Sequence, residues 1–193
     1  MSREMKLDRF EIRLSGLGGQ GILTLGKIMG QALALDHGYN VAQTQSYGPE
    51  ARGGASRSDL VISSSTISYP KTISLDLLVA LSQEACNKFF TNLKPSGALV
   101  VDTSMVGQTP TNIFLGLPFT DMARKVGLVQ TTNIVTLGAL THFLPFMRAV
   151  SVRKSLKSIL PSKIIDINLK AFNAGFNAAK KQYPDAPEKW IFS

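Results

Sequence analysis

The sequence predicts an α/β protein: a three-layer α/β/α sandwich with a mostly parallel sheet, a Rossmann-like start and a helical C-terminal part. Near the N-terminus, an alternating segment at 9–15 leads through a glycine turn into a helix-compatible run at 22–35. Two near-continuous apolar runs, at 76–81 and 97–102, are typical of parallel strands covered on both faces. Because strands and helices alternate along the chain, right-handed crossovers between parallel strands are expected.

The first half of the chain divides into three predicted strands and one helix. Polar and apolar residues alternate over 9–15, as they do in a strand, and the run 22–35 follows the glycines as a helix. A second strand is expected at 39–44. It ends in a long loop at 45–55 that contains a proline and several glycines, and the next strand is expected at 58–62.

The second half is predicted to complete the sheet and then to become mostly helical. A helix at 83–93 separates the two apolar strands, and Lys94-Pro95-Ser96-Gly97 closes that helix. A buried helix is expected at 133–147 and a short one at 152–160. Pro161 and Ser162 then end one helix and begin the next.

The final helix carries one apolar stripe, which we expect to face the core rather than a cofactor. Its members recur at steps of three and four residues: Ile165, Leu169, Phe172, Phe176 and Ala179. Residues 1–183 are expected to form a single domain. After Tyr183, two prolines predict an extended C-terminal arm over 184–193, and its aromatic end is of a kind that often finds a partner.

Composition and charge narrow the class of protein. With 44% hydrophobic and 18% charged residues, the chain is expected to be an ordinary folded protein. No apolar run approaches the roughly 18 residues of a membrane helix, and the polar N-terminus does not resemble a secretory signal, so we expect no membrane partner and a cytoplasmic location.

The net charge of the chain is +8. From Arg148 onward the chain has nine basic and three acidic residues, hence +6, but neither an arginine-rich run nor a stacking platform accompanies them, so nucleic acid is not the expected partner. A solvated helix face, or a surface for an acidic partner or cofactor, is expected instead.

Cysteine and histidine predict neither a metal site nor a catalytic residue in this chain. The single cysteine, Cys86, lies in a helical segment and cannot hold an iron–sulfur cluster, which usually takes four thiolates. His37 and His142 have no carboxylate or thiolate nearby at ligand spacing.

The first candidate binding feature is the turn Gly16-Leu17-Gly18-Gly19-Gln20-Gly21. Glycines allow a sharp turn and a close ligand approach, and the positive end of the following helix favours phosphate or carboxylate. The alternative is that the turn merely packs a strand tightly on a helix. A P-loop is excluded because Ile22 stands where lysine is needed, and a dinucleotide site is disfavoured because Gln43, Thr44 and Gln45 stand where a ribose-binding acid is needed.

The second candidate feature is the loop that follows the second predicted strand. Its candidate ligand- or subunit-binding residues are Tyr47, Glu50, Arg52, Gly53, Gly54, Ser56 and Arg57. Arginine forks suit phosphate or carboxylate, and open α/β sheets bind ligands at the carboxyl ends of their strands. Alternatively, the proline and glycines only shape a long connection, and Arg52 pairs with Glu50.

Together, these loops and two later segments resemble the gamma subunit of the 2-oxoacid:ferredoxin oxidoreductases. The residues that carry the resemblance are the glycine turn at 16–21, the string from Gln43 to Ser58, Leu77-Leu78-Val79-Ala80-Leu81-Ser82-Gln83-Glu84-Ala85 and Asn133-Ile134-Val135-Thr136-Leu137-Gly138-Ala139-Leu140. The similarity covers most of the chain and weakens in the last helices. The string around Ser46 to Ser58 resembles the 2-oxoglutarate type most closely, while the pyruvate, branched-chain and indolepyruvate relatives share the fold.

The resemblance implies a division of labour between subunits. The complex converts a 2-oxoacid and coenzyme A to an acyl-CoA, CO2 and reduced ferredoxin. Thiamine diphosphate, magnesium and iron–sulfur clusters are then expected in the alpha and beta subunits and in a ferredoxin-like delta subunit where present, with ferredoxin as electron acceptor. This chain is expected to be inactive alone, to complete the complex, and to help bind or admit coenzyme A through the glycine turn and the Arg52 loop.

Two other functions remain open from the residues. A purely structural subunit would use the same loops to hold the alpha subunit and would bind no small molecule. An independent Rossmann-type nucleotide-binding protein would bind NAD(P) saturably as an isolated chain, which calorimetry can measure.

Overall fold

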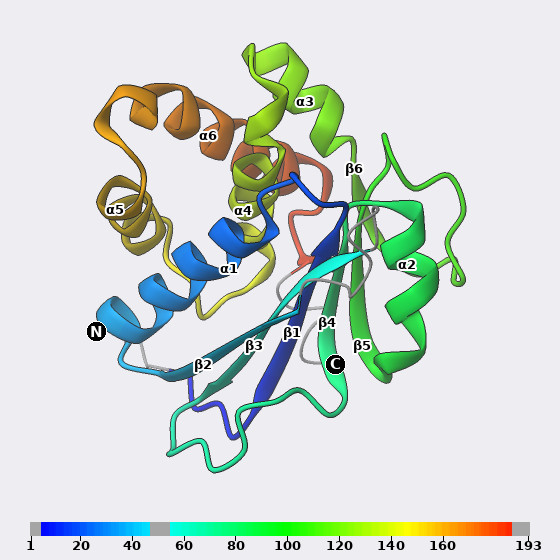
Figure 1. Ribbon diagram of the computed structural model, residues 1–193, viewed down its shortest axis with the longest axis vertical. Helices are drawn as coiled ribbons and strands as arrows, with labels where there is room; N and C mark the ends of the chain where they lie inside the picture. Colours follow the sequence, from blue (N-terminus) through cyan, green and yellow to red (C-terminus); the bar gives the residue numbers. More distant parts are fainter. Residues whose placement is uncertain (1–4, 47–54, 187–193) are drawn as a thin grey trace.

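A six-stranded sheet organises the computed structural model, which describes residues 5–46 and 55–186. The strands of this described part are β1 (Phe10–Gly16), β2 (Asn40–Ser46), β3 (Ser56–Ser63), β4 (Leu75–Ala80), β5 (Leu93–Asp102) and β6 (Leu115–Leu117). Their order across the sheet is β2-β3-β1-β4-β5-β6. Strand β1 therefore lies near the middle, and its C-terminal end places the glycine turn at the centre of one sheet edge (Figure 1).

The sheet is mostly parallel, as predicted, with one reversed strand. Strand β3 runs antiparallel to both of its neighbours, whereas β1, β4, β5 and β6 pair in parallel. Strands β2 and β3 pair antiparallel from Asn40↔Ser63 to Ser46↔Arg57, and a connection between Ser46 and Ser56 is shorter than the dozen or more residues that a crossover between parallel strands needs. One consequence matters for the site: Gly16 is paired with Ser56, so the beginning of β3 lies beside the glycine turn, while Ser46 at the end of β2 pairs with Arg57, one strand further out.

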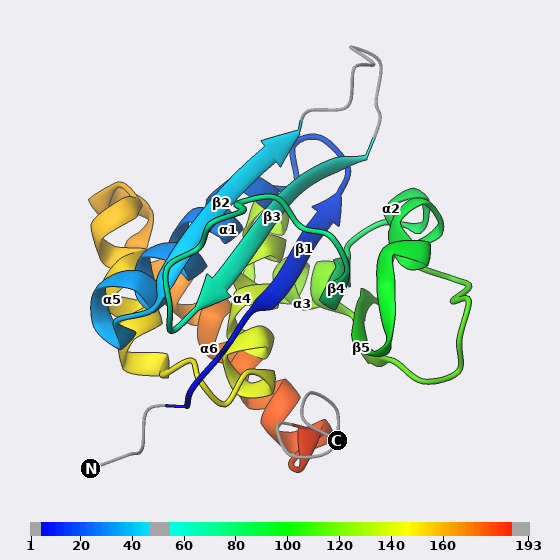
Figure 2. The same ribbon diagram turned by 90° about the horizontal axis from the view of Figure 1, so that it is seen from below.

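Helices cover both faces of the sheet. They are α1 (Ile22–Gln31), α2 (Gln83–Phe89), α3 (Phe119–Val126), α4 (Thr132–Phe143), α5 (Ala149–Ile159) and α6 (Ile165–Gln182). Figures 1 and 2 show α1, α4, α5 and α6 on one face and α2 on the other. The predicted three-layer α/β/α arrangement is confirmed, although the α2 layer is thin and no helix of the described residues covers the outer face of β2 and β3 (Figure 2).

The thick helical layer depends on close contact between α4 and α6. Four of the five residues predicted for the stripe on α6 are confirmed as a core face: Phe172 and Ala179 are fully buried, and Leu169 and Phe176 pack against the same cluster. Ile165, the first residue of the helix, is half-buried and does not belong to that cluster. The two helix backbones meet at Gly138 of α4 and Gly175 of α6. A Cβ on Gly138 would overlap the carbonyl oxygen of Phe172, so glycine is required for this approach.

The sequence interpretation missed β6 and α3, which occupy residues 115–126. The signal for α3 was present, because Phe119, Met122, Ala123 and Val126 follow the i, i+3, i+4, i+7 pattern of an amphipathic helix. The stop signal was present as well: Gly127 has φ 110° and donates backbone hydrogen bonds to Ala123 and Arg124, as in a Schellman motif.

The boundary between α2 and β5 also differs from the prediction. Strand β5 begins at Leu93, so the predicted break at Lys94-Pro95-Ser96-Gly97 lies inside a strand. The proline is tolerated there because the pairing of β4 with β5 shifts register between Leu75 and Leu77, and prolines in strands concentrate at such irregularities.

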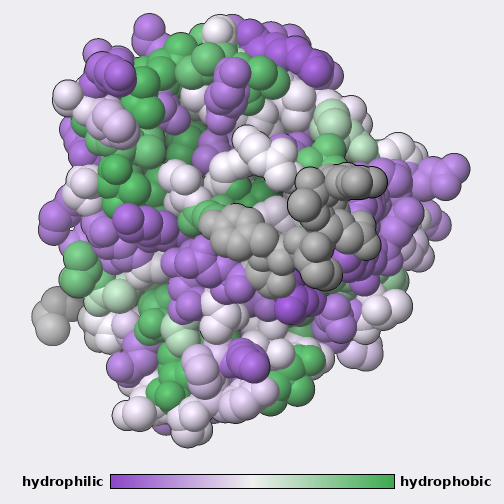
Figure 3. Space-filling view, viewed as in Figure 1, coloured by the Kyte–Doolittle hydropathy of each residue, from purple (hydrophilic) through white to green (hydrophobic). Residues whose placement is uncertain are grey.

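Hydrophilic and apolar residues are mixed on the described surface that one side of the molecule presents (Figure 3). No helix in the described part is long and apolar enough to cross a bilayer. The domain boundary at 183 stays a prediction; Ala186, just beyond it, is buried, and residues 187–193 lie outside the described residues.

Candidate functional site

The glycine turn connects β1 to α1 through two left-handed backbone positions. Gly19 has φ 88° and Gly21, the N-cap of α1, has φ 71°. A Cβ at Gly21 would also collide with the side chain of Asn133, whose Nδ2 donates a 3.1 Å hydrogen bond to the Gly21 carbonyl. The turn is therefore shaped by its glycines and fixed to α4 by one side chain.

Gln20 stabilises the turn from inside. Its Oε1 accepts a 2.7 Å hydrogen bond from the Leu17 amide, and its Nε2 donates at 3.1 Å to the carbonyl of Leu81, just after β4. The side chain fills the space that a Cβ on Gly16 would need. Gln20 thus has a defined structural contact, and its amide bridges the turn to the neighbouring strand end.

Two backbone N–H groups of the turn, those of Gly18 and Gly19, have no acceptor among the described residues. The first turn of α1 contains no acidic residue that would neutralise the helix dipole. Both features favour an anion at this end of the sheet.

An open groove of about 310 Å³ lies beside these donors. It is lined by Leu17, Gly18, Gly19, Gln20, Met105, Thr120, Arg124, Val129, Gln130 and Thr132. Met105, Thr120, Arg124, Val129, Gln130 and Thr132 were not anticipated as site residues, and two of them, Thr120 and Arg124, belong to α3, which the sequence interpretation missed. The guanidinium of Arg124 lies at the rim of the groove, is mostly exposed, and forms an exposed ion pair with Asp121 at 2.6 Å.

Helix α3 is held in place by a buried carboxylate. Asp102, at the end of β5, accepts hydrogen bonds from the Thr120 amide at 3.1 Å and from the Thr120 hydroxyl at 2.5 Å. A carboxylate that accepts such bonds caps the helix and complements its dipole. The far wall of the groove is therefore rigidly attached to the same sheet edge as the glycine turn.

The second predicted loop is only partly described. Tyr47, Glu50, Arg52, Gly53 and Gly54 lie outside the described residues. Ser56 is paired with Gly16 of the turn. Arg57, however, lines a different pocket on the outer face of the sheet, so the two described candidates from this loop lie apart: Ser56 is beside the glycine turn and Arg57 is in that pocket.

The chain's only cysteine has no role in this site. Cys86 is buried in α2, and burial raises the pKa of its thiol. The described residues contain no group of three or more histidine, cysteine, aspartate or glutamate side chains that could hold a metal. With one thiol in the sequence, the donor set does not suit an iron–sulfur cluster.

Cys86 is expected to react slowly with alkylating reagents in the native protein. The thiolate is the reactive form, and both its raised pKa and its burial suppress attack. Iodoacetamide labelling at about pH 8, followed by mass spectrometry, should be at least about tenfold slower in the folded than in the denaturant-unfolded chain. Equal rates in the two states would contradict this placement of Cys86.

Comparisons with known proteins give a consistent result. A family model described as pyruvate ferredoxin/flavodoxin oxidoreductase matches residues 11–178. The 2-oxoglutarate synthase subunit KorC of Methanocaldococcus jannaschii is 42% identical over 185 residues, which cover 93% of this chain and 98% of KorC. The ketoisovalerate oxidoreductase subunit VorA of Methanothermobacter thermautotrophicus is 32% identical over 174 residues, which cover 88% of this chain and 36% of VorA. Among solved structures, the gamma subunit of a keto/oxoacid ferredoxin oxidoreductase from Geobacter sulfurreducens has a TM-score of 0.83 and 36% identity, covering 91% of this chain and 98% of that subunit.

Proposed function

The chain belongs to the pyruvate ferredoxin/flavodoxin oxidoreductase family, and we propose that it is the gamma subunit of a 2-oxoglutarate:ferredoxin oxidoreductase. The complex carries out oxidative decarboxylation of 2-oxoglutarate with coenzyme A, releasing CO2 and passing electrons to ferredoxin. The observation that carries the proposal is the near full-length similarity to a 2-oxoglutarate synthase subunit, which exceeds the similarity to the ketoisovalerate relative.

The chain contributes no catalytic group of its own. Thiamine diphosphate, magnesium and iron–sulfur clusters belong to the alpha, beta and, where present, ferredoxin-like delta subunits, in the cytoplasm. The donor set supports this division: one buried thiol and two separated histidines offer no ligand set for a cluster.

Assembly with the other subunits is the first role of the chain, and the second is to help bind coenzyme A at the glycine-turn groove. The free N–H groups of Gly18 and Gly19, the start of α1 and the Arg124 cation suit a diphosphate group. The candidate residues for ligand or subunit contact are Gly16, Gly18, Gly19, Gln20 and Gly21 from the glycine turn, together with Tyr47, Glu50, Arg52, Gly53, Gly54, Ser56 and Arg57 from the second loop.

Steady-state kinetics of the assembled complex test the coenzyme A role. Arg52→Ala and Arg124→Gln should each raise the KM for coenzyme A by about tenfold while kcat falls less, because each removes a charge-assisted contact worth about 1.5 kcal/mol. Lys180→Gln, an exposed charge on α6, is the matched control and should leave the KM unchanged.

The same variants separate this role from a purely structural one. Size-exclusion chromatography reports whether each variant still assembles. Assembly lost in Arg52→Ala, or a KM for coenzyme A that stays at the wild-type value in both variants, would support the structural alternative, in which these loops only hold the alpha subunit.

A further inference from the structure

A second pocket lies on the outer face of the sheet, opposite the helical layer that contains α1. Successive residues of β1 point to opposite faces. Ile12 and Leu14 enter the main hydrophobic cluster, so Arg13 between them faces the other side. There, Arg13 and residues of β2 and β3 line a polar pocket of about 410 Å³.

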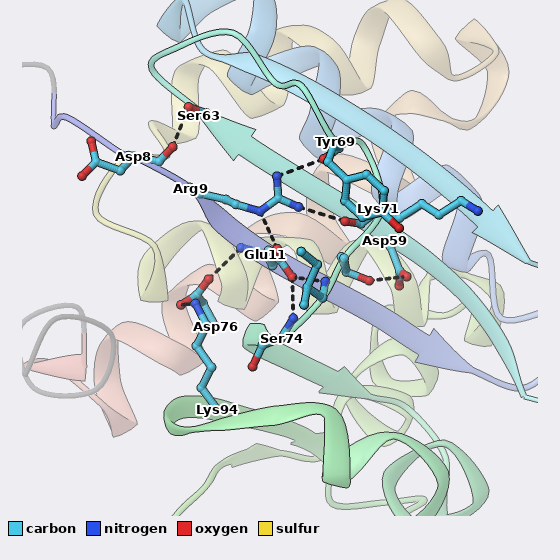
Figure 4. A network of polar contacts seen from close by, with 12 residues as sticks. Asp8, Arg9, Glu11, Asp59, Ser63, Tyr69, Lys71, Ser74, Asp76 and Lys94 are labelled. Carbon is cyan, nitrogen blue, oxygen red and sulfur yellow. Dashed lines mark hydrogen bonds and ion pairs between the residues drawn. The ribbon is translucent and has the colours of Figure 1, made fainter.

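The segment between β3 and β4 forms one side of the pocket. Residues 64–74 cross the outer face of β1 and β3 (Figure 2). Figure 4 shows how this segment is held: Arg9 donates to the carbonyls of Tyr69 and Lys71 at 2.9 and 2.8 Å, and Glu11 accepts from two later amides of the segment. The segment brings Tyr69, Lys71 and Thr72 to the pocket on a backbone anchored to β1.

The floor of the pocket is a neutralised ion pair. Arg13 binds Asp59 through two parallel hydrogen bonds of 2.8 Å, and both side chains are nearly fully buried. The Arg13 guanidinium also donates hydrogen bonds to Asn92 at 2.8 Å and to Thr72 at 3.1 Å, and its central carbon lies 4.9 Å from the centre of the Phe89 ring. The one carboxylate of the pocket lining is therefore committed to Arg13.

Among the described residues, two cations of the pocket have no close carboxylate partner. Arg57 comes only to 4.0 Å from Asp59, which already has its close partner, and over a third of the Arg57 side chain is exposed. The Lys71 ammonium has no ion pair with a described residue. Counting Arg13, Arg57, Lys71 and Asp59, the lining carries a net charge of +2.

We propose that this pocket binds the phosphate or diphosphate group of a small molecule. Arg57 and Lys71 supply the charge, and Thr44 and Asn92 supply neutral polar groups beside them. The volume lies in the range of small-molecule sites, and the concave shape suits a compact anion better than a flat protein surface. The pocket shares no lining residue with the glycine-turn groove, so its test does not depend on coenzyme A binding in that groove.

Calorimetric titration of the full chain with inorganic pyrophosphate at low ionic strength tests the proposal. Wild-type protein should bind saturably at one site. Arg57→Gln and Lys71→Gln should each weaken binding by about tenfold, as expected for loss of one charge-assisted contact. Lys71 is exposed, so its variant should fold normally, and Lys180→Gln should bind as wild type does.

Three results would overturn the proposal. One is the absence of saturable binding, and another is equal weakening by the distant Lys180→Gln control, which would indicate unspecific attraction to a basic protein. The third comes from repeating the titration with the assembled complex. If pyrophosphate binding disappears there, the pocket receives an acidic segment of a partner subunit rather than a small molecule.

Discussion

Gly138→Ala is expected to destabilise the protein by about 3 kcal/mol, and Gly175→Ala by a similar amount. In each case the new methyl group would overlap a backbone carbonyl of the facing helix, Phe172 for the first variant and Val135 for the second. A backbone atom cannot rotate away as a side chain can, so α4 and α6 must move apart and lose packing over the length of their contact. Urea denaturation followed by circular dichroism measures the loss.

Gly30→Ala is the matched control, because it also places alanine at a buried helical glycine. Its Cβ would meet only the side chains of Leu60 and Val41 at 3.6 Å, an ordinary contact distance. Alanine has the higher helix propensity, so this variant should be neutral or more stable by about 0.5–1 kcal/mol. Similar stability changes in all three variants would contradict the close approach of α4 and α6.

Arg13→Met is expected to cost about 3–5 kcal/mol of stability, because it leaves Asp59 as a buried carboxylate without its bidentate partner. Thr72 still donates to Asp59 at 2.8 Å, and Arg57 is 4.0 Å away, but neither replaces two buried charge-assisted bonds. Chemical denaturation of the variant measures the effect.

The double variant Arg13→Met/Asp59→Leu separates the loss of the pair from the cost of an unpaired charge. Removing both charges should restore much of the stability, since a buried pair can often be replaced by apolar residues at little net cost. A double variant as unstable as the sum of its single variants, or a single Arg13→Met variant within about 1 kcal/mol of wild type, would be inconsistent with the pair described here.

Local patterns in the sequence were sufficient to predict the strand, turn and helix around the glycines. Alternation at 9–15 and the apolar run after Gly21 are signals carried by neighbouring residues, and the structure confirms both elements. The reversed direction of β3 was not predicted. A hairpin and a crossover unit can contain strands with the same residue pattern, and the two arrangements differ in the connection between those strands.

The contacts that define the two pockets depend on how neighbouring strands align in the sheet. This register could not be predicted from the spacing of residues along the sequence. Arg13 meets Asp59 because β1 and β3 align those two positions across the sheet, 46 residues apart. The same register turns Arg57 toward the outer pocket and away from the glycine turn. Gln20 was predicted as a contact residue, but its bond to Leu81 depends on β4 lying beside β1.

Reconstitution of the complex tests the proposed function most directly. The partner subunits are purified with and without this chain, and ferredoxin reduction is measured with coenzyme A and either 2-oxoglutarate or pyruvate. We expect activity only when the chain is present, with kcat/KM for 2-oxoglutarate at least about tenfold above that for pyruvate. Full activity without the chain, or a preference for pyruvate, would contradict its assignment as the gamma subunit of a 2-oxoglutarate:ferredoxin oxidoreductase.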